Sequence, residues 1–168
     1  MQRRSVEAVV QALNSANVRY LIVGGLAVVA HGYVRFTADV DLVLDLDEAN
    51  LCRALAEFER LGYRPRAPVR LEEFLDPDTR NAWVNEKGMT VFSLYSSAHP
   101  ATELDVFVQA PFDFRDAYAR AARMEVAPAV MATFLGLDDL VTLKKAAGRP
   151  QDMLDVERLE ALRKDSSQ

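Results

Sequence analysis

The chain has 168 residues, half of them apolar, and a net charge of −5 at pH 7, which suits one globular domain with a full hydrophobic core. It contains no run of about 18 apolar residues and no apolar block near its start, so the sequence predicts neither a membrane span nor a secretion signal. The acidic balance argues against a broad, non-specific nucleic-acid surface, and the single cysteine cannot form an internal disulfide, which fits a cytoplasmic protein.

The first third of the chain alternates helical and strand patterns, with glycines at the expected helix ends. The predicted elements are a helix to about Ala16, a strand over Val18–Val23, a helix over Leu26–His31, a strand over Val40–Asp45 and a helix from its cap Asp47 to Gly62. Residues 64–86 contain three prolines and are expected to be irregular.

The rest of the chain also contains both strand and helix patterns. The predicted elements are strands over Gly88–Tyr95 and Glu103–Gln109, a helix over Phe112–Ala122, one or two short strands within Met124–Leu135, and helices over Leu137–Ala147 and Pro150–Arg163. We therefore expect an α/β (α+β) fold in which a small mixed sheet is flanked by helices. One domain is expected over residues 1–168, with a sheet core (1–135) and a C-terminal helical pair (136–168).

Two aspartates stand one residue apart at the start of the second predicted strand. Because strand side chains alternate between faces, Asp39 and Asp41 point to one side and Val40 and Leu42 to the core. Two carboxylates held this close repel each other unless a cation lies between them. The pattern therefore predicts a metal site.

A third carboxylate follows on a later strand. Alternation within Glu103–Phe107 places Asp105 on the face opposite to Leu104 and Val106. If this strand lies beside the strand of Asp39 and Asp41, three acids share one edge, which suits two magnesium ions and an in-line phosphoryl displacement. Asp39 and Asp41 would hold the metals, and Asp105 would complete the site as the base for an acceptor hydroxyl.

The glycine pair Gly24-Gly25 fits the same chemistry. Without Cβ atoms its backbone can approach a triphosphate closely, and the helix that follows offers N–H donors. Alone, such a pair is also typical of a tight turn between a strand and a helix. Its combination with three strand acids favours nucleotide binding.

Several stretches of the chain together resemble one family. They are GGLAVVAHG (24–32), RFTADVDL (35–42), the strand around Asp105, and LDDLVTLKKAAGRPQD (137–152). They resemble the nucleotidyltransferase (polymerase-beta-like) superfamily, and more closely the minimal bacterial nucleotidyltransferases of the AbiEii type, many of which are toxins or toxin-like proteins of toxin–antitoxin systems. Residues 46–102 carry no specific match.

This resemblance implies a nucleotidyltransferase fold and an enzyme. Such an enzyme binds a nucleoside triphosphate with Mg²⁺, transfers the nucleoside monophosphate to an acceptor and releases pyrophosphate. For the toxin-like members it implies tRNA or a protein as acceptor, and a possible antitoxin as partner.

Two basic residues are candidates for binding the triphosphate. Lys144 falls in the middle of the apolar arc of its predicted helix, where its ammonium needs an anion unless it reaches the surface past the helix end. The resemblance implies a functional role for this position. Arg35 lies just before the Asp39 strand and would neutralise either nucleotide charge or a nearby structural acid, and the sequence leaves both open.

The last predicted helix carries further acids. Asp152 and Asp155 share one face with apolar residues and could pair with Lys144 or Arg149 in a structural network. His31 is expected to pack between helix and sheet with its polar tip satisfied.

Two other functions remain open at this point. One is an antibiotic-modifying nucleotidyltransferase, since an acidic chain suits a small cationic substrate. The other is a non-catalytic module that binds nucleotide or a partner, for which an exposed apolar patch with Phe74, Leu75 and Trp83 is the candidate surface. The arginines at 64, 66 and 70 form either a solvated loop or a local patch for one structured RNA.

Overall fold

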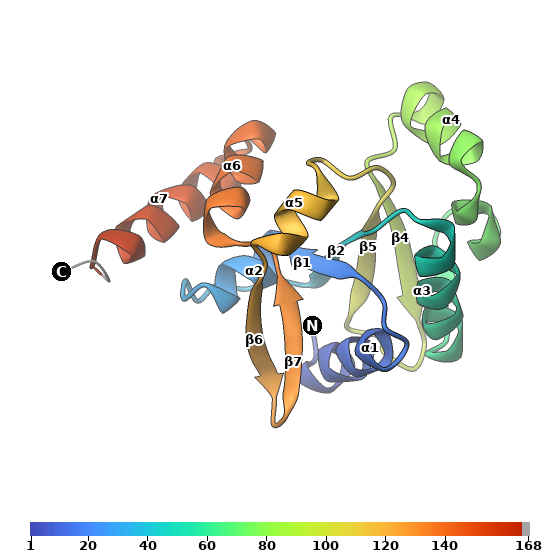
Figure 1. The fold of residues 1–168 in the computed structure, drawn as a ribbon, viewed down its shortest axis with the longest axis horizontal. Coiled ribbons are helices and arrows are strands. Elements are labelled where there is room, and N and C mark those ends of the chain that lie inside the picture. The colour runs from blue at the N-terminus through green and yellow to red at the C-terminus, as the bar shows by residue number, and fades with distance from the viewer. Residues whose placement is uncertain (166–168) are drawn as a thin grey trace.

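The computed structural model describes residues 1–165, and a seven-stranded mixed β-sheet runs through its centre (Figure 1). The strands are β1 (Tyr20–Val23), β2 (Asp39–Leu44), β3 (Tyr63–Pro65), β4 (Val91–Ser96), β5 (Glu103–Phe107), β6 (Ala122–Ala127) and β7 (Val130–Phe134). Their order across the sheet is β3-β4-β5-β2-β1-β7-β6. The expected mixed sheet flanked by helices is confirmed.

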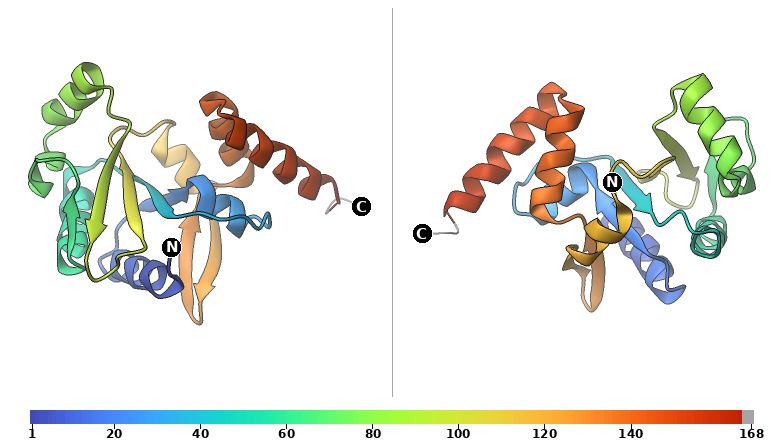
Figure 2. Two further views of the ribbon diagram at one scale, coloured as in Figure 1. Left: turned by 180° about the vertical axis from the view of Figure 1, so that it is seen from behind. Right: turned by 45° about the horizontal axis from the view of Figure 1, so that its top comes forward.

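Helices lie on both sides of this sheet. They are α1 (Arg3–Ser15), α2 (Gly24–Ala30), α3 (Glu48–Arg60), α4 (Pro77–Lys87), α5 (Phe114–Ala119), α6 (Leu137–Ala147) and α7 (Pro150–Asp165), with a 3-10 turn η1 (Leu71–Leu75). Helices α6 and α7 stand together at one end of the molecule, and α3 and α4 lie at the other (Figures 1 and 2). Gly148, in the left-handed conformation, ends α6 and allows the chain to turn back into α7.

The pairing of the central strands decides the position of the candidate site. Strand β2 runs parallel to β5, with Asp41 opposite Asp105 and Asp39 opposite Glu103. On their outer sides, β1 pairs antiparallel with β2, and β4 pairs antiparallel with β5. The acids therefore occupy one face of the middle of the sheet.

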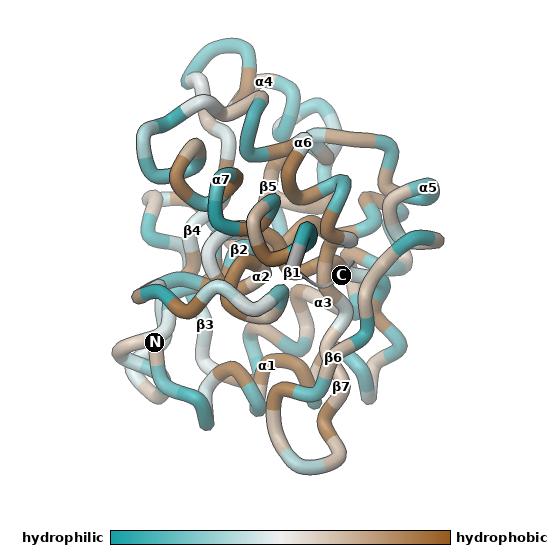
Figure 3. Tube along the Cα trace, turned by 90° about the vertical axis from the view of Figure 1, so that its left-hand side faces the viewer, coloured by the Kyte–Doolittle hydropathy of each residue, from teal (hydrophilic) through white to brown (hydrophobic). Residues whose placement is uncertain are grey.

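The opposite face of the same strands is apolar. Val40, Leu42, Leu104 and Val106 are each at most 1% exposed, and they join one hydrophobic core with the buried residues of α1 and α3. Figure 3 shows hydrophobic stretches in the central strands, with hydrophilic stretches along the outer helices. In β2 and β5, the residues that alternate in the sequence therefore point in turn to the hydrophobic core and to the face that carries the acids.

The region expected to be irregular is more regular than its prolines indicated. Residues 64–86 contain part of β3, the turn η1 and most of α4. Pro77 stands at the first position of α4, where a missing N–H is harmless, and the Asp76 carboxylate caps the helix. Gly88 ends α4 in the left-handed conformation, which is why β4 begins at Val91 and not at Gly88.

The prediction of an exposed apolar patch for partner binding is wrong. Phe74 is fully buried and Trp83 is 4% exposed, because both rings pack against Phe92 of β4 at centroid distances of 5.2 and 5.1 Å.

Residues 166–168 of the expected C-terminal helical part lie outside the described residues. Within residues 1–165, no helix has both the length and the apolar character required to cross a membrane.

Candidate active site

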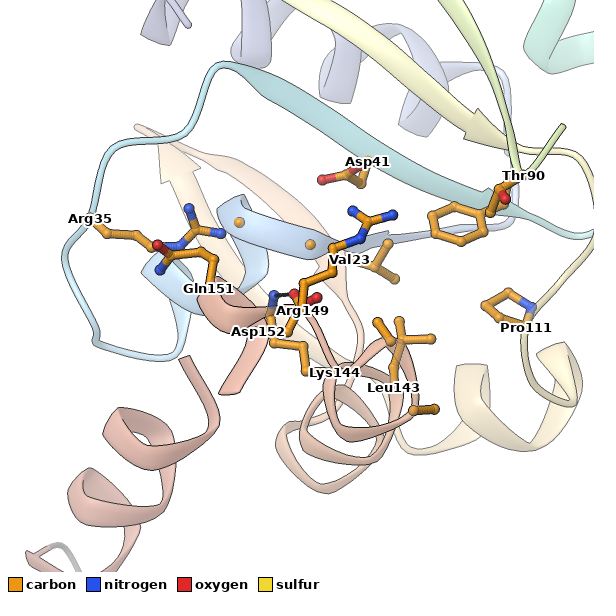
Figure 4. Close-up of a pocket in the computed structure, with 15 residues that line it drawn as sticks. Val23, Arg35, Asp41, Thr90, Pro111, Leu143, Lys144, Arg149, Gln151 and Asp152 are labelled. Atoms are coloured by element: carbon orange, nitrogen blue, oxygen red, sulfur yellow. Dashed lines mark hydrogen bonds and ion pairs between the residues drawn. The ribbon is translucent and has the colours of Figure 1, made fainter. Parts of the chain in front are cut away.

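A pocket of about 490 Å³ lies between the sheet and the α6–α7 pair (Figure 4). The sheet side is lined chiefly by Gly24, Gly25, Arg35, Asp41, Thr90 and Phe107, and the helical side by Leu143, Lys144, Arg149, Gln151 and Asp152. The pocket therefore brings together segments that are more than 100 residues apart in the chain. Asp39 and Asp105 stand beside Asp41 on the sheet but are not among the lining residues.

The two glycines are required by the side chains that surround them. Gly24 begins α2 with a positive φ of 63°, and a Cβ there would lie 1.9 Å from Oδ2 of Asp41. A Cβ on Gly25 would lie 2.6 Å from Oγ1 of Thr37 and 2.8 Å from Nη2 of Arg35. Both glycines thus allow polar side chains to lie directly over the start of α2.

The carboxylates form two neighbouring rows on the face of the sheet. Adjacent strands are about 5 Å apart, so Asp41 and Asp105, directly opposite in the parallel register, are close neighbours. The Ser93 hydroxyl of β4 donates a hydrogen bond of 2.5 Å to Oδ1 of Asp105 and so fixes that carboxylate. Glu103, opposite Asp39, is engaged by the Arg66 guanidinium.

Crowding of these acids alters their protonation. Burial, followed by the negative charges of Asp105 and Asp39, raises the pKa of Asp41 to about 6. The backbone N–H of Gly25 and the Lys144 ammonium act in the opposite direction. The pKa of Asp39 is also raised, first by burial and then by Asp105 and Glu103. The acidic rows therefore favour a proton or a cation.

The acids fit a magnesium ion by their chemistry. Within residues 1–165, no three carboxylate, imidazole or thiol side chains converge into a ready-made metal site. Carboxylate oxygens are nevertheless the ligands that Mg²⁺ prefers, and a cation would offset both the burial and the repulsion that raise the pKa of Asp41. Asp41 and Asp105, with Asp39 next to them, are the residues that could hold it.

On the helical wall of the pocket, acidic side chains pair with the buried lysine. Lys144 is buried, and its Nζ lies 2.9 Å from Oδ1 of Asp152 and 2.8 Å from Oδ2 of Asp155. Nε of Arg35 lies 3.1 Å from Oδ1 of the same Asp155. Lys144 therefore does not reach the surface past the helix end, and the structural network expected around Asp152 and Asp155 is present.

One pocket cation stands apart from this network. Arg149 comes from the turn between α6 and α7, and its side chain extends into the pocket (Figure 4). No ion pair joins it to an acid anywhere in the described part of the chain. The sequence predicts Arg149 only as a partner for acids. Its position after Gly148, at a turn between two helices, is the sequence feature that could have indicated a place in the pocket.

Other residues of interest have structural partners. His31 Nε2 lies 2.8 Å from the carbonyl oxygen of Leu135, in agreement with its expected packing role. Thr90, Phe107 and Gln151 line the pocket without having been singled out, because nothing in a strand or helix pattern marks a residue that another element covers.

Two solved structures have a fold similar to that of this chain. The crystal structure of ANT(2")-Ia in complex with adenylyl-2"-tobramycin matches with a TM-score of 0.60 and 15% identity over 94% of this chain and 86% of that chain. An antigenic nucleotidyltransferase-like protein from Paracoccidioides brasiliensis matches with a TM-score of 0.61 and 19% identity, over 95% and 75% of the two chains. At such identities the likeness establishes the nucleotidyltransferase fold alone.

The sequence defines the family more narrowly. Residues 4–165 match the family described as nucleotidyltransferase of unknown function (DUF6036), and the chain belongs to that family. It is thus an enzyme of the nucleotidyltransferase type. No curated protein matches the chain.

Proposed function

We propose that this enzyme transfers a nucleoside monophosphate from a nucleoside triphosphate to a hydroxyl acceptor in a Mg²⁺-dependent reaction. The observation that carries the proposal is the parallel register of β2 and β5, which sets Asp41 opposite Asp105 at the edge of a pocket with basic residues on its far side. Residues 1–168 would act as one domain, with the acids on the sheet part and Lys144 on the C-terminal helical part.

Each site residue has a role in this reaction. Asp39, Asp41 and Asp105 would hold two magnesium ions, which when bound neutralise and orient the phosphates. Lys144 and Arg149 from the helical side, and Arg35 from the loop before β2, would bind the triphosphate above Gly24 and Gly25.

Asp105 would also move the proton. The acceptor oxygen attacks the α-phosphorus, the bond from that phosphorus to the bridging oxygen of the β-phosphate breaks, and pyrophosphate leaves. The proton of the acceptor hydroxyl passes to Asp105, whose Oδ1 is fixed by Ser93. Positioning and charge neutralisation account for most of the catalysis in such transfers.

The acceptor we propose is tRNA or a protein, and a surface next to the acids favours RNA. Tyr95 of β4 is 42% exposed, and the Arg66 guanidinium lies 5.3 Å from its ring centroid. Arg64 is the register partner of Tyr95, so both share the sheet face that carries Ser93 and Asp105. Stacking on an aromatic ring beside arginines suits an unpaired nucleotide.

A small cationic antibiotic is the second candidate acceptor. The fold is shared with ANT(2")-Ia, whose structure contains an adenylylated tobramycin, and the acidic rows beside the pocket suit a polycation. The resemblance of the glycine and aspartate motifs to AbiEii-type toxins would favour RNA or a protein instead, and with it a partner antitoxin.

Label transfer tests the proposal directly. The protein is incubated with each α-labelled nucleoside triphosphate, Mg²⁺ and a cell extract, with tobramycin in a parallel sample, and the products are separated into RNA, protein and small molecules. We expect label in one fraction, loss of that label in Asp41→Asn, and release of pyrophosphate. Label that persists in Asp41→Asn would contradict the assignment of the acids, and label confined to tobramycin would select the second candidate.

A further inference from the structure

A fully buried aspartate on α7 joins two cations of the pocket. Asp155 is 0% exposed and contacts Lys144 of α6 at 2.8 Å and Arg35, in the loop between α2 and β2, at 3.1 Å. The Gln151 side-chain amide donates to its Oδ1 at 3.1 Å. Asp155 is therefore the point at which three separate segments around the pocket meet.

These charge contacts leave hydrogen-bonding capacity unused. Among residues 1–165, Nε of Arg35 and Oδ2 of Asp155 have no partner with hydrogen-bond geometry, although both atoms are buried. Lys144 donates one of its three protons to Asp152. An ion pair that serves stability alone is expected to be saturated with hydrogen bonds, since unsatisfied buried groups are destabilising.

Both cations that contact Asp155 line the pocket. Nη2 of Arg35 is 2.8 Å from the position that a Cβ on Gly25 would take, so the guanidinium covers the start of α2. Lys144 lines the pocket and influences the pKa of Asp41. In Figure 4 the Arg35 side chain extends from the loop that leads into β2, and the Lys144 side chain lies on the helical side of the pocket.

We propose that Asp155 is a positioning residue that holds Arg35 and Lys144 in place to receive the phosphates of the bound nucleotide. Two long cationic side chains from different elements repel each other, and each loses rotational freedom when it is held at a site. A buried carboxylate between them offsets the repulsion and fixes both groups before the ligand arrives. This inference rests on the proposed nucleotidyl transfer, and it concerns the binding of the triphosphate.

The test measures binding and not turnover. Asp155→Asn keeps the shape of the side chain and removes its charge. We expect it to weaken the binding of a non-transferable Mg–triphosphate nucleotide analogue, measured by calorimetry, by about tenfold or more. The same loss is expected with inorganic triphosphate and Mg²⁺ as probe, because the two cations contact phosphates only.

A matched control comes from the same pair of helices. Glu160→Gln removes the ion pair of 2.7 Å between Lys145 and Glu160, which also joins α6 to α7 but lies outside the pocket lining. This variant should bind both probes as wild type does. Equal weakening in Asp155→Asn and Glu160→Gln would reduce Asp155 to a general link between helices.

A double-mutant cycle separates positioning from other effects. Asp155→Asn should lose most of its effect in an Arg35→Gln background, because the two residues are in contact. In an Arg149→Gln background it should retain its effect, because within residues 1–165 no ion pair joins Arg149 to Asp155. Full additivity with Arg35→Gln would overturn the proposal.

The remaining outcomes are also decisive. Unchanged or tighter binding by folded Asp155→Asn would show that Asp155 is structural or competes with the ligand. If that variant does not fold, Asp155→Glu keeps the charge but displaces the carboxylate, and wild-type binding by it would overturn the proposal. Failure of wild-type protein to bind any triphosphate would instead contradict the proposed function itself.

Discussion

The two sides of the pocket differ in whether their charged side chains are paired with side chains of opposite charge. On the sheet side, Asp41 lines the pocket with Asp39 and Asp105 beside it, and within residues 1–165 no ion pair joins any of the three to a basic side chain. Burial, followed by the negative charges of Asp105 and Asp39, raises the pKa of Asp41 to about 6. On the helical wall, Lys144 is matched by acids at 2.8 and 2.9 Å. The acidic face therefore favours a proton or a cation, whereas acids already hold Lys144 in place on the helical side.

This difference suits the two sides to two tasks, the binding of a cation and the binding of an anion. A row of unmatched carboxylates is unfavourable in the free protein and becomes favourable only when a cation binds. A compensated cation cluster is stable in the free protein and needs little rearrangement to meet an anion. Substitutions on each side can show whether the sheet side carries the chemistry and the helical side binds the triphosphate.

The largest effect is expected on the sheet wall. Asp41→Asn and Asp105→Asn should each lower the rate of label transfer by at least about a hundredfold, since both remove a charge from the reacting centre. Glu103→Gln is the matched control, because Glu103 lies on the same face of β5 but is engaged by Arg66. A similar loss in Glu103→Gln would mean that the whole acidic face, and not the two opposed aspartates, carries the reaction.

The same wall should make metal-free stability depend on pH. Because the folded pKa of Asp41 is about 6 and its ordinary value is 3.8, the folded state holds a proton that the unfolded chain has released between these values. The stabilisation from this group is thus present below about pH 4 and lost as pH rises through about 6, a change of up to about 3 kcal/mol.

Chemical denaturation with a chelator present measures this effect. The free energy of unfolding of wild type, relative to Asp41→Asn, should fall between about pH 4 and pH 7. Addition of Mg²⁺ at pH 7 should restore wild type more than the variant. Parallel pH profiles for both proteins would show that Asp41 is not strained by its neighbours.

On the helical wall, a smaller effect on binding is expected. Arg149→Gln should raise the KM for the triphosphate by about tenfold with little change in kcat, since the loss of one charged hydrogen bond affects bound substrate and transition state alike. Lys145→Gln, on the same helical pair but outside the pocket lining, should leave the KM unchanged. A fall in kcat with an unchanged KM would move Arg149 to the chemical step.

The smallest effect is expected at the surface. Lys145 and Glu160 are 52% and 44% exposed, so the loss of their ion pair in Glu160→Gln should change the free energy of unfolding by less than about 1 kcal/mol. Thermal unfolding of the metal-free protein measures it. A larger change would show that α6 and α7 depend on their outer contacts and not on the buried Lys144–Asp155 pair.

The sheet wall could be predicted from the sequence because strand geometry is local. The period of two residues placed Asp39 and Asp41 on one face and Asp105 on the site face of its own strand, and the glycine pair marked the turn beside them. The segment 64–86 could not be predicted in the same way. Its prolines indicated irregular structure, yet Pro77 starts a helix, and Phe74 and Trp83 are buried by packing against Phe92 of a distant strand.

The sequence by itself therefore determined the nucleotidyltransferase class, most of the helices and strands outside residues 64–86, and which acids are candidates to hold a cation, since these depend on local periodicity and on residue type. Only the tertiary structure decided that β5 lies parallel to β2 with Asp105 opposite Asp41. It also decided that Arg35 and Lys144 share Asp155, and that Arg149 enters the pocket. Contacts between segments more than 100 residues apart depend on how the helices pack on the sheet, and no local pattern records that packing.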